Sequence, residues 1–251
     1  GQECVYTTGW PSWVHIENFS AWHNLPIGTR SNGFDGLDTE FKFNSPHHVA
    51  HINMLAEYAK KGWFTYSGRT NQGEARFFSG ECAMLTSSSS ALGNIRKNAK
   101  FEFSVNFLPY NHTIEGAPQN SIIGGATLWV MSGKKADEYK GVTKFFSYLS
   151  TPDVQAAWHQ GTGYVPITNA AFDLTKKSGF YEKNPGMDMA VRQLNNKPPT
   201  ANSKGLRFGN YVQGREVIEE EIEAVIMGKK DAQKAMDDAK KNADNRKKIE
   251  A

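Results

Sequence analysis

Short β-rich segments alternate with amphipathic helical segments along the chain, and this alternation constrains the fold more than any other feature. The β-rich segment 4–9, "CVYTTG", precedes the helical segment 45–62, "SPHHVAHINMLAEYAKKG". The segment 81–88, "ECAMLTSS", predicts a buried strand, and a helix that ends near Lys100 follows it. Strands that alternate with helices along the chain predict an α/β architecture.

Capping residues and chain breakers set the expected helix ends. Ser45 suits the N-cap, Pro46 the first turn and Gly62 the end of one helix. Its predicted buried face consists of Val49, Ile52, Leu55, Ala56 and Ala59. Pro152 divides the segment 136–160 into two helices, and Gly228 separates two further helices over 214–228 and 231–249. The segments 101–110 and 121–133 predict two more strands, and 161–168 an extended segment bounded by glycine and proline.

Composition excludes several classes of protein. The chain has 251 residues, 39% of them hydrophobic, which predicts a folded globular protein and not a disordered one. The net charge of +3 is too small to indicate nucleic-acid binding. We find no run of about 18 apolar residues that would span a membrane, and the first ten residues do not form a signal peptide.

The two cysteines, Cys4 and Cys82, allow two interpretations. They are too few for a disulfide framework, and they lack the spacing and the histidines of a zinc site. A single disulfide in an oxidising compartment and two buried thiols are both compatible with the sequence. A separation of their Cα atoms beyond about 7 Å would exclude the disulfide.

Motifs for catalysis and metal binding are missing. The sequence contains no GxSxG, P-loop, HExxH or GxGxxG pattern, and neither cysteine has the flanking residues of a nucleophile. His47 and His51 have the spacing of metal ligands, but His48 stands where a metalloprotease needs glutamate. We expect an exposed first helical turn there, no metal site, no cofactor and no enzyme activity.

Four positions have the chemistry to hold an anion without reacting with it. Ser88 lies at a helix start that offers hydroxyls and free N–H groups, and Gly125 lets a ligand approach the backbone. Tyr164 offers a phenol from a loop. Arg215 lies near a helix start, where its charge opposes the helix dipole unless an anion or carboxylate answers it. A serine cap, a simple bulge, core packing and an ion pair with Glu219 are the alternatives for these four positions.

Two tryptophans, Trp10 and Trp13, follow the first predicted strand on a segment where Gly9 and Pro11 disfavour regular structure. Core packing is one interpretation of the two rings. The other is that they stack on the apolar face of a polyol at the carboxyl edge of the sheet, where α/β proteins usually bind ligands.

The chain resembles a known family along almost its whole length. The segments "GWPSW", "IENFSAWHNLP", "APQNSIIGGATLWVMSGK" and "AAWHQGTGYVPIT" are similar to those of the periplasmic sn-glycerol-3-phosphate-binding proteins of bacterial ABC importers. The resemblance also includes "NGFDG", "GECAM", "GFYEKNPG", "NNKPP" and "GKKDAQKAMD". It covers about the last three fifths of that family, whose signal peptide and most of whose N-terminal lobe would precede Gly1.

The resemblance implies a type II periplasmic-binding-protein fold of two α/β lobes that close on a ligand. Residues 1–124 and 166–251 would form the C-terminal lobe, and 125–165 the hinge crossings with a segment of the N-terminal lobe. Ser88, Gly125, Tyr164 and Arg215 match positions that contact the glycerol phosphate in the family. Trp10 and Trp13 match its aromatic wall, whereas a tyrosine, a glutamate and a serine would come from the missing lobe.

We therefore expect a periplasmic, monomeric binding protein that delivers sn-glycerol 3-phosphate, or a glycerophosphodiester, to an inner-membrane ABC permease. A guanidinium, a phenol, hydroxyls and glycine amides would bind a phosphate without a base to drive chemistry. A sugar or polyol binder of the same fold is the first alternative, and a periplasmic phosphodiesterase is the second.

Overall fold

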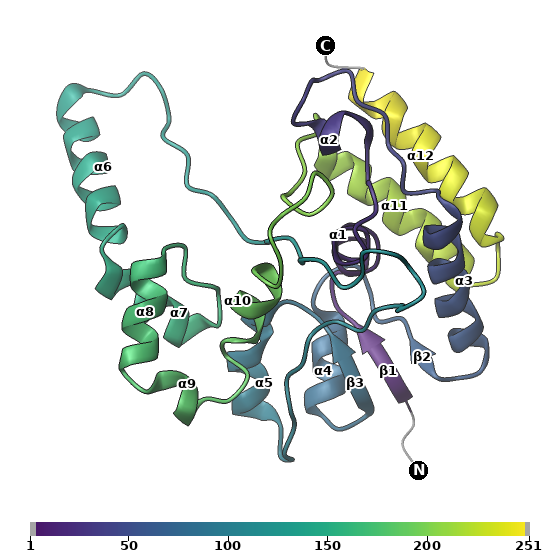
Figure 1. The fold of residues 1–251 in the computed structure, drawn as a ribbon, viewed down its shortest axis with the longest axis horizontal. Helices are drawn as coiled ribbons and strands as arrows, with labels where there is room; N and C mark the ends of the chain where they lie inside the picture. The colour runs from purple at the N-terminus through teal and green to yellow at the C-terminus, as the bar shows by residue number, and fades with distance from the viewer. Residues whose placement is uncertain (1–3, 249–251) are drawn as a thin grey trace.

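The protein contains a parallel sheet flanked by helices (Figure 1). The computed structural model describes residues 4–248. The strands of the sheet are β1 (Cys4–Thr8), β2 (Phe64–Thr65) and β3 (Cys82–Thr86), in the order β2-β1-β3. The predicted strands at 4–9 and 81–88 are confirmed. β3 is less buried than predicted, because it lies at the sheet edge with Cys82 covered and Met84 exposed.

Three long helices enclose the main hydrophobic core on one side of this sheet (Figure 1). They are α3 (Pro46–Lys60), α11 (Tyr211–Ile226) and α12 (Ala232–Lys248). Gly62 adopts a φ of 71°, which explains why α3 ends there as predicted. The fully buried side chains of this core include Ile52, Leu55, Phe41, Phe43, Ile218, Ile222 and Met236. Both C-terminal helices were predicted; Ile249, the last predicted position, lies outside the described residues.

The segment after β1 is helical, contrary to the expectation from its glycine and proline. Pro11 and Ser12 form a first helical turn, and η1 (Trp13–Asn18), a π-helix, and α1 (Phe19–Trp22) continue it. Proline is favoured at the first helical position, where its missing N–H would have no partner. A short helix α2 (Thr29–Gly33) follows.

Smaller helices pack beside β3. The helix α4 (Gln72–Phe78) contacts both β1 and β3. The turn η2 (Ser89–Ala91) and the helix α5 (Leu92–Asn98) follow β3, as predicted for the serine-rich segment. Phe77, Ala91 and Ile95 form a second small core here.

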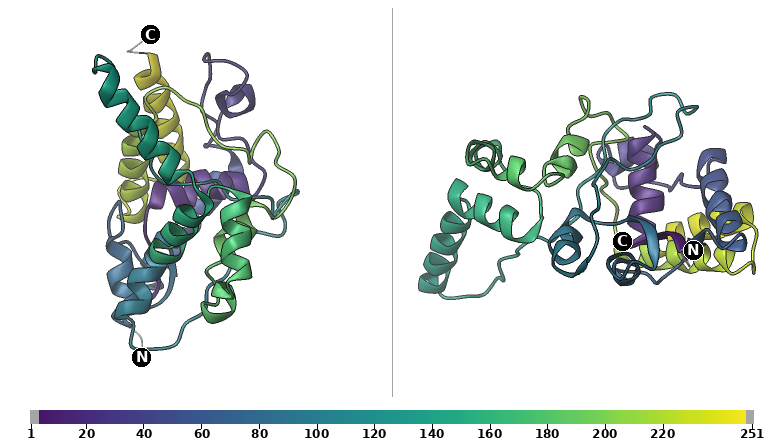
Figure 2. Two further views of the ribbon diagram at one scale, coloured as in Figure 1. Left: turned by 90° about the vertical axis from the view of Figure 1, so that its left-hand side faces the viewer. Right: turned by 90° about the horizontal axis from the view of Figure 1, so that it is seen from below.

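A separate group of helices lies away from α3, α11 and α12, as Figure 1 and the right view of Figure 2 show. It contains α6 (Ala136–Leu149), α7 (Pro152–Thr162), α8 (Asn169–Lys177) and α9 (Phe180–Lys183). The predicted break at Pro152 is confirmed. α10 (Met189–Leu194) leads back toward the sheet (Figure 1).

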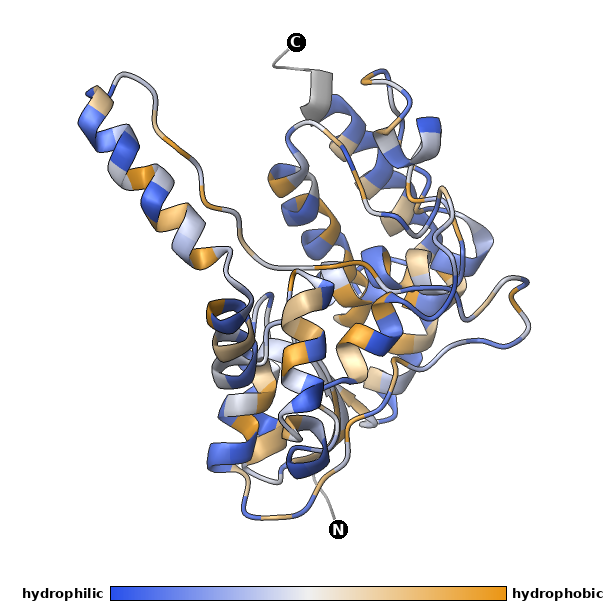
Figure 3. Cartoon of the chain, turned by 60° about the vertical axis from the view of Figure 1, so that its left-hand side comes forward, coloured by the Kyte–Doolittle hydropathy of each residue, from blue (hydrophilic) through white to orange (hydrophobic). Residues whose placement is uncertain are grey.

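The two strands predicted at 101–110 and 121–133 are wrong, because both segments are irregular. A strand needs a partner for its backbone ladder, and neither segment pairs with β1, β2 or β3. Apolar side chains of the second segment are strongly exposed, among them Trp129 at 86% and Met131 at 71%. Figure 3 shows hydrophobic residues, in orange, along the irregular segment that leads to α6.

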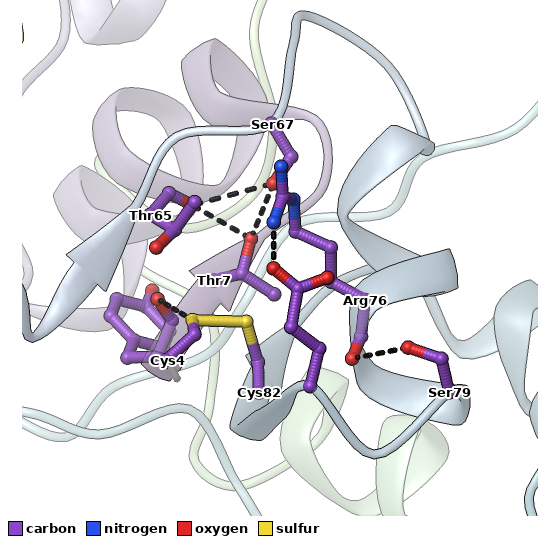
Figure 4. Close-up of a disulfide and its surroundings, with 9 residues drawn as sticks. Cys4, Thr7, Thr65, Ser67, Arg76, Ser79 and Cys82 are labelled. Atoms are coloured by element: carbon purple, nitrogen blue, oxygen red, sulfur yellow. Dashed lines mark hydrogen bonds and ion pairs between the residues drawn. A yellow bond between two sulfur atoms is a disulfide. The ribbon is translucent and has the colours of Figure 1, made fainter. Parts of the chain in front are cut away.

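A disulfide joins β1 to β3 (Figure 4). Cys4 and Cys82 are register partners on the parallel strands, and their Cα atoms are 4.4 Å apart. The structure therefore decides for the disulfide over two thiols. Of the described helices, none is long and apolar enough to cross a membrane.

Candidate ligand-binding site

Trp10 occupies a strained backbone position at the carboxyl end of β1. Its φ is 51°, which is uncommon for a large aromatic residue. Two hydrogen bonds hold it there: its N–H donates to the Thr70 carbonyl at 2.8 Å, and its carbonyl accepts from Val14 N–H at 2.9 Å. Backbone strain of this kind persists where the surroundings fix it and is concentrated at binding sites.

Trp13 packs against the glycine pair that the sequence singled out. A Cβ built on Gly124 would lie 2.9 Å from Trp13 Cζ2, so any side chain there would displace the indole. Gly125 has a φ of 137°, and a Cβ built on it would lie 3.8 Å from Tyr164 Cε1. Trp13, the glycine pair and the half-exposed Tyr164 therefore lie together.

The serine segment at the start of η2 is largely engaged by the protein itself. Ser88 caps η2 by accepting the Ser90 N–H at 3.3 Å. Ser87 donates to Glu74 at 2.9 Å, and Ser89 donates to the Gly163 carbonyl at 3.0 Å. Ser89 thereby joins the serine segment to the loop that carries Tyr164.

A large cavity collects three of the six predicted residues. Trp13, Ser88 and Tyr164 are among the residues that line a space of about 1520 Å³ between β3, α5 and the segments near 105 and 190. Trp10, Gly125 and Arg215 do not line it, although Gly124 does. The cavity exceeds the roughly 300–1,000 Å³ of ordinary ligand sites.

Arg215 connects to the aromatic segment through a buried carboxylate. Its Nε and Nη2 donate to the two oxygens of Glu17 in η1, at 2.5 and 2.7 Å. Glu17 is 1% exposed, whereas the Arg215 side chain is 42% exposed. The carboxylate that forms an ion pair with Arg215 is thus Glu17. Glu219 is the partner that was considered from the sequence.

Glu219 instead holds the turn between the two tryptophans. Ser12, which is buried, donates to Glu219 Oε1 at 2.8 Å. One turn further along α11, Glu223 accepts from Arg69 Nε and Nη2 at 2.8 and 2.7 Å. One face of α11 therefore holds both the tryptophan turn and the loop after β2 by charged hydrogen bonds.

Burial and neighbouring charges shift the pKa values of this group. Burial raises the pKa of Glu219, and the hydrogen bond from Ser12 opposes that shift. Burial works to lower the pKa of Arg215, but the hydrogen bonds and charge of Glu17 outweigh it and hold that pKa above its ordinary value. Burial, and then the charge of Glu17, raise the pKa of Tyr211.

Sequence reasoning missed Glu17 and Ser12. The signal was present, since Glu17 lies four residues after Trp13 among residues of apolar character. This signal was not decisive, because the helical segment that contains Glu17 was not predicted. No spacing in the sequence linked Glu17 to Arg215, which is 198 positions away.

The predicted exposed histidine turn is confirmed for His47, which is exposed, but not for the two histidines that follow it. His48 is buried, with Nδ1 2.6 Å from Ser45 Oγ and Nε2 2.8 Å from Ser20 Oγ. His51 lies 3.0 Å from His15. Within residues 4–248, no group of three or more His, Cys, Asp or Glu residues could hold a metal ion.

The family model for bacterial extracellular solute-binding proteins matches residues 6–189, which include the tryptophan turn, the serine segment and Tyr164. The chain belongs to the bacterial extracellular solute-binding proteins.

Curated relatives in this solute-binding family are close in sequence. The sn-glycerol-3-phosphate-binding periplasmic protein UgpB of Pectobacterium atrosepticum is 55% identical over 239 residues, which are 95% of this chain and 54% of that protein. UgpB of Yersinia pseudotuberculosis is 53% identical over 244 residues, 97% of this chain and 56% of that protein. The chain thus spans about half the length of these relatives.

Solved structures of solute-binding proteins share the fold. UgpB from Mycobacterium tuberculosis, in complex with glycerophosphocholine, has a TM-score of 0.74 at 18% identity, over 97% of this chain and 58% of that one. The GacH receptor of Streptomyces glaucescens has a TM-score of 0.74 at 15% identity, over 99% of this chain and 60% of that one. A cyclo/maltodextrin-binding protein complexed with maltotetraose has a TM-score of 0.71 at 18% identity, over 98% and 60% of the two chains. The predicted type II fold is confirmed.

Proposed function

We propose that the chain is part of the substrate-binding component of an ABC importer and binds sn-glycerol 3-phosphate or a glycerophosphodiester. The observation that carries this proposal is the identity of 55% to a protein named for sn-glycerol 3-phosphate, over 95% of the chain. The family match over residues 6–189 includes five of the six positions that we assign to the ligand, all but Arg215.

In this proposal Arg215 binds the phosphate, and Ser88, Tyr164 and the Gly125 backbone assist it. Trp10 and Trp13 stack on the carbon skeleton. The glycine pair 124–125 and the turn 163–166 are the crossings between lobes, with 1–124 and 166–251 on one side and 125–165 between them. Closure of the two lobes would then bring Trp13, Tyr164 and Arg215 onto one ligand.

The protein would act in the periplasm as a monomer, without a cofactor, and deliver its ligand to a membrane permease. The assigned side chains are hydrogen-bond donors and flat rings, which suit binding better than hydrolysis. Incubation with glycerophosphocholine should therefore release no choline; sustained release would favour the phosphodiesterase alternative.

Calorimetric titration of the complete protein encoded by the gene tests the ligand class. We expect binding of glycerol 3-phosphate, glycerophosphocholine or both, and none of maltose or free glycerol at the same concentration. Binding of maltose in preference to the phosphate esters would support the alternative of a sugar-binding protein, which the fold shared with the maltodextrin-binding protein makes the natural comparison.

A further inference from the structure

The pair of Glu17 and Arg215 has an unusual arrangement for an anion site. Both oxygens of the Glu17 carboxylate accept hydrogen bonds from Arg215, Oε1 from Nε at 2.5 Å and Oε2 from Nη2 at 2.7 Å. The carboxylate is 1% exposed and the arginine side chain 42% exposed. An anion that approaches from solvent would therefore meet the guanidinium first, with its position already fixed and its Nη1 outside this fork.

The charges around Arg215 do not sum to a positive value. Two ion pairs each have one member on α11: Arg69 with Glu223, and Arg215 with Glu17. A third carboxylate, Glu219, accepts a hydrogen bond from Ser12. Two positive and three negative formal charges leave a net charge of −1 in this group. Arg215 thus offers directed N–H donors without surplus positive charge.

Two tyrosines that contact this cluster do not change that balance. Tyr211 lies under Arg215, whose guanidinium carbon is 5.1 Å from the ring centre. Tyr66 donates to Glu223 at 2.6 Å. Both phenols have pKa values raised, first of all by burial, so they stay neutral across the physiological range.

We propose that Glu17 is a positioning and specificity-determining residue, which fixes the Arg215 guanidinium, cancels its charge and makes the phosphate subsite favour a singly charged phosphate ester over a doubly charged one. This inference rests on the proposed function, which assigns Arg215 to the phosphate. Two ligands share the favoured chemistry: a glycerophosphodiester, and glycerol 3-phosphate below its second ionisation.

The physical reason is the cost of removing charge from water. The Born cost of desolvation rises with the square of the ligand charge, whereas its attraction to fixed donors rises only in proportion to the charge. An unpaired cation in the site would offset the desolvation cost of the second negative charge, whereas a neutral ion pair does not. The second pKa of a phosphate monoester is about 6, so the charge of the monoester changes from −1 to −2 within a pH range that is easy to measure.

The test is calorimetric titration of the complete protein with glycerophosphocholine and glycerol 3-phosphate between about pH 5 and about pH 7.5, on either side of that ionisation. For the wild type we expect constant affinity for the diester and at least a roughly fivefold loss of affinity for the monoester as pH rises. An affinity for the monoester that rises with pH would overturn the inference without any variant.

Glu17→Gln keeps the shape of the side chain and removes its charge. At about pH 7.5 we expect the affinity ratio of monoester to diester to increase by roughly tenfold. Equal changes in both affinities, with the ratio and the pH profile unchanged, would show a merely structural role and overturn the inference. Glu17→Asp retains the charge and should restore the wild-type ratio even if both affinities fall.

Glu223→Gln is the matched control. Glu223 lies on α11, the helix that carries Arg215, and it accepts two hydrogen bonds from Nε and Nη2 of Arg69 just as Glu17 does from Arg215. The Glu223→Gln change should leave the ratio and the pH profile as in the wild type; an equal shift would make the effect one of general charge and overturn the role of Glu17. If the wild type binds neither phosphate ester, the proposed function fails, and this inference fails with it.

Discussion

At the scale of single residues, three histidines lie against Phe19 and a fourth, His15, contacts one of them, His51. They are His15, His23, His48 and His51, with the His51 ring stacked on Phe19 at a centroid distance of 4.0 Å. Burial lowers the pKa of each of them, to about 3 for His15 and for His48. The folded protein therefore keeps these rings neutral where an unfolded chain would protonate them.

This difference predicts loss of stability in acid. The folded-state pKa values lie below the ordinary 6.5, so the unfolded state binds more protons as the pH falls from about 6.5 toward about 3. The stability contribution is complete above 6.5 and is lost through that window, by up to about 1.4 kcal/mol per pH unit for each histidine.

Urea unfolding at a series of pH values measures this slope. His48→Gln should make the slope shallower. His47→Gln changes an exposed residue in the same helix, whose charge is a smaller cause than burial of the lowered pKa of His48, and should change the slope less. A slope equal in the wild type and His48→Gln would contradict the assignment of the acid sensitivity to this cluster.

At the scale of elements, the contact of α4 with β1 depends on one glycine. A Cβ built on Gly73 would lie 2.3 Å from the Thr8 carbonyl oxygen, which is closer than atoms can pack. Gly73→Ala should thus push α4 from the sheet and lower the free energy of unfolding by about 1–3 kcal/mol.

Gly141→Ala is the matched control, because nothing lies within 4 Å of its built Cβ in α6. Alanine has a higher helix propensity, so this change should raise stability by up to about 1 kcal/mol. Thermal unfolding of both variants distinguishes them, and equal effects would argue against the close approach of α4 to β1.

The link between β1 and β3 gives another prediction. The disulfide closes a loop with a sequence separation of 78 residues, and cross-links of this kind stabilise by about 2–5 kcal/mol. A reducing agent should lower the unfolding midpoint of the wild type to that of the Cys4→Ser/Cys82→Ser double variant. A double variant that still responds to the reducing agent would contradict this explanation.

Helices were predicted better than strands for a physical reason. Ser45, Pro46 and Gly62 are local signals that set the ends of α3, so its bounds could be found from the sequence. The apolar segment 121–133 has strand composition, but a strand exists only where a partner supplies hydrogen bonds, and composition does not report partners. The π-helix at Trp13–Asn18 had no local signal at all.

The site was predictable in part for the same reason. Trp13, Gly125 and Tyr164 were singled out from local sequence, and the structure brings them together. The partner of Arg215 was not predictable, because Glu17 reaches it only through the packing of η1 against α11. Long-range ion pairs of this kind follow from the fold and leave no periodic pattern in the sequence.

At the scale of the whole molecule, two bodies meet near the candidate site. The sheet with α3, α11 and α12 forms one, and α6–α9 form the other (Figures 1 and 2). The second body includes α8 and α9, which the proposed boundary at residue 166 would place with the sheet. Tyr164 lies on the loop after α7, and Ser89 ties that loop to the sheet side through the Gly163 carbonyl. This arrangement supports a ligand site whose geometry depends on the relative position of the two bodies.

The proposed function depends above all on Arg215, which we propose binds the phosphate of the ligand. Arg215→Lys keeps a cation opposite Glu17 but loses the planar fork, so calorimetric titration of the complete protein should show affinity for the phosphate ester weakened by about 10- to 100-fold. Arg69→Lys makes the same change in the neighbouring pair with Glu223 and should alter affinity by less than about twofold. Wild-type affinity in Arg215→Lys, with both variants folded, would contradict the account.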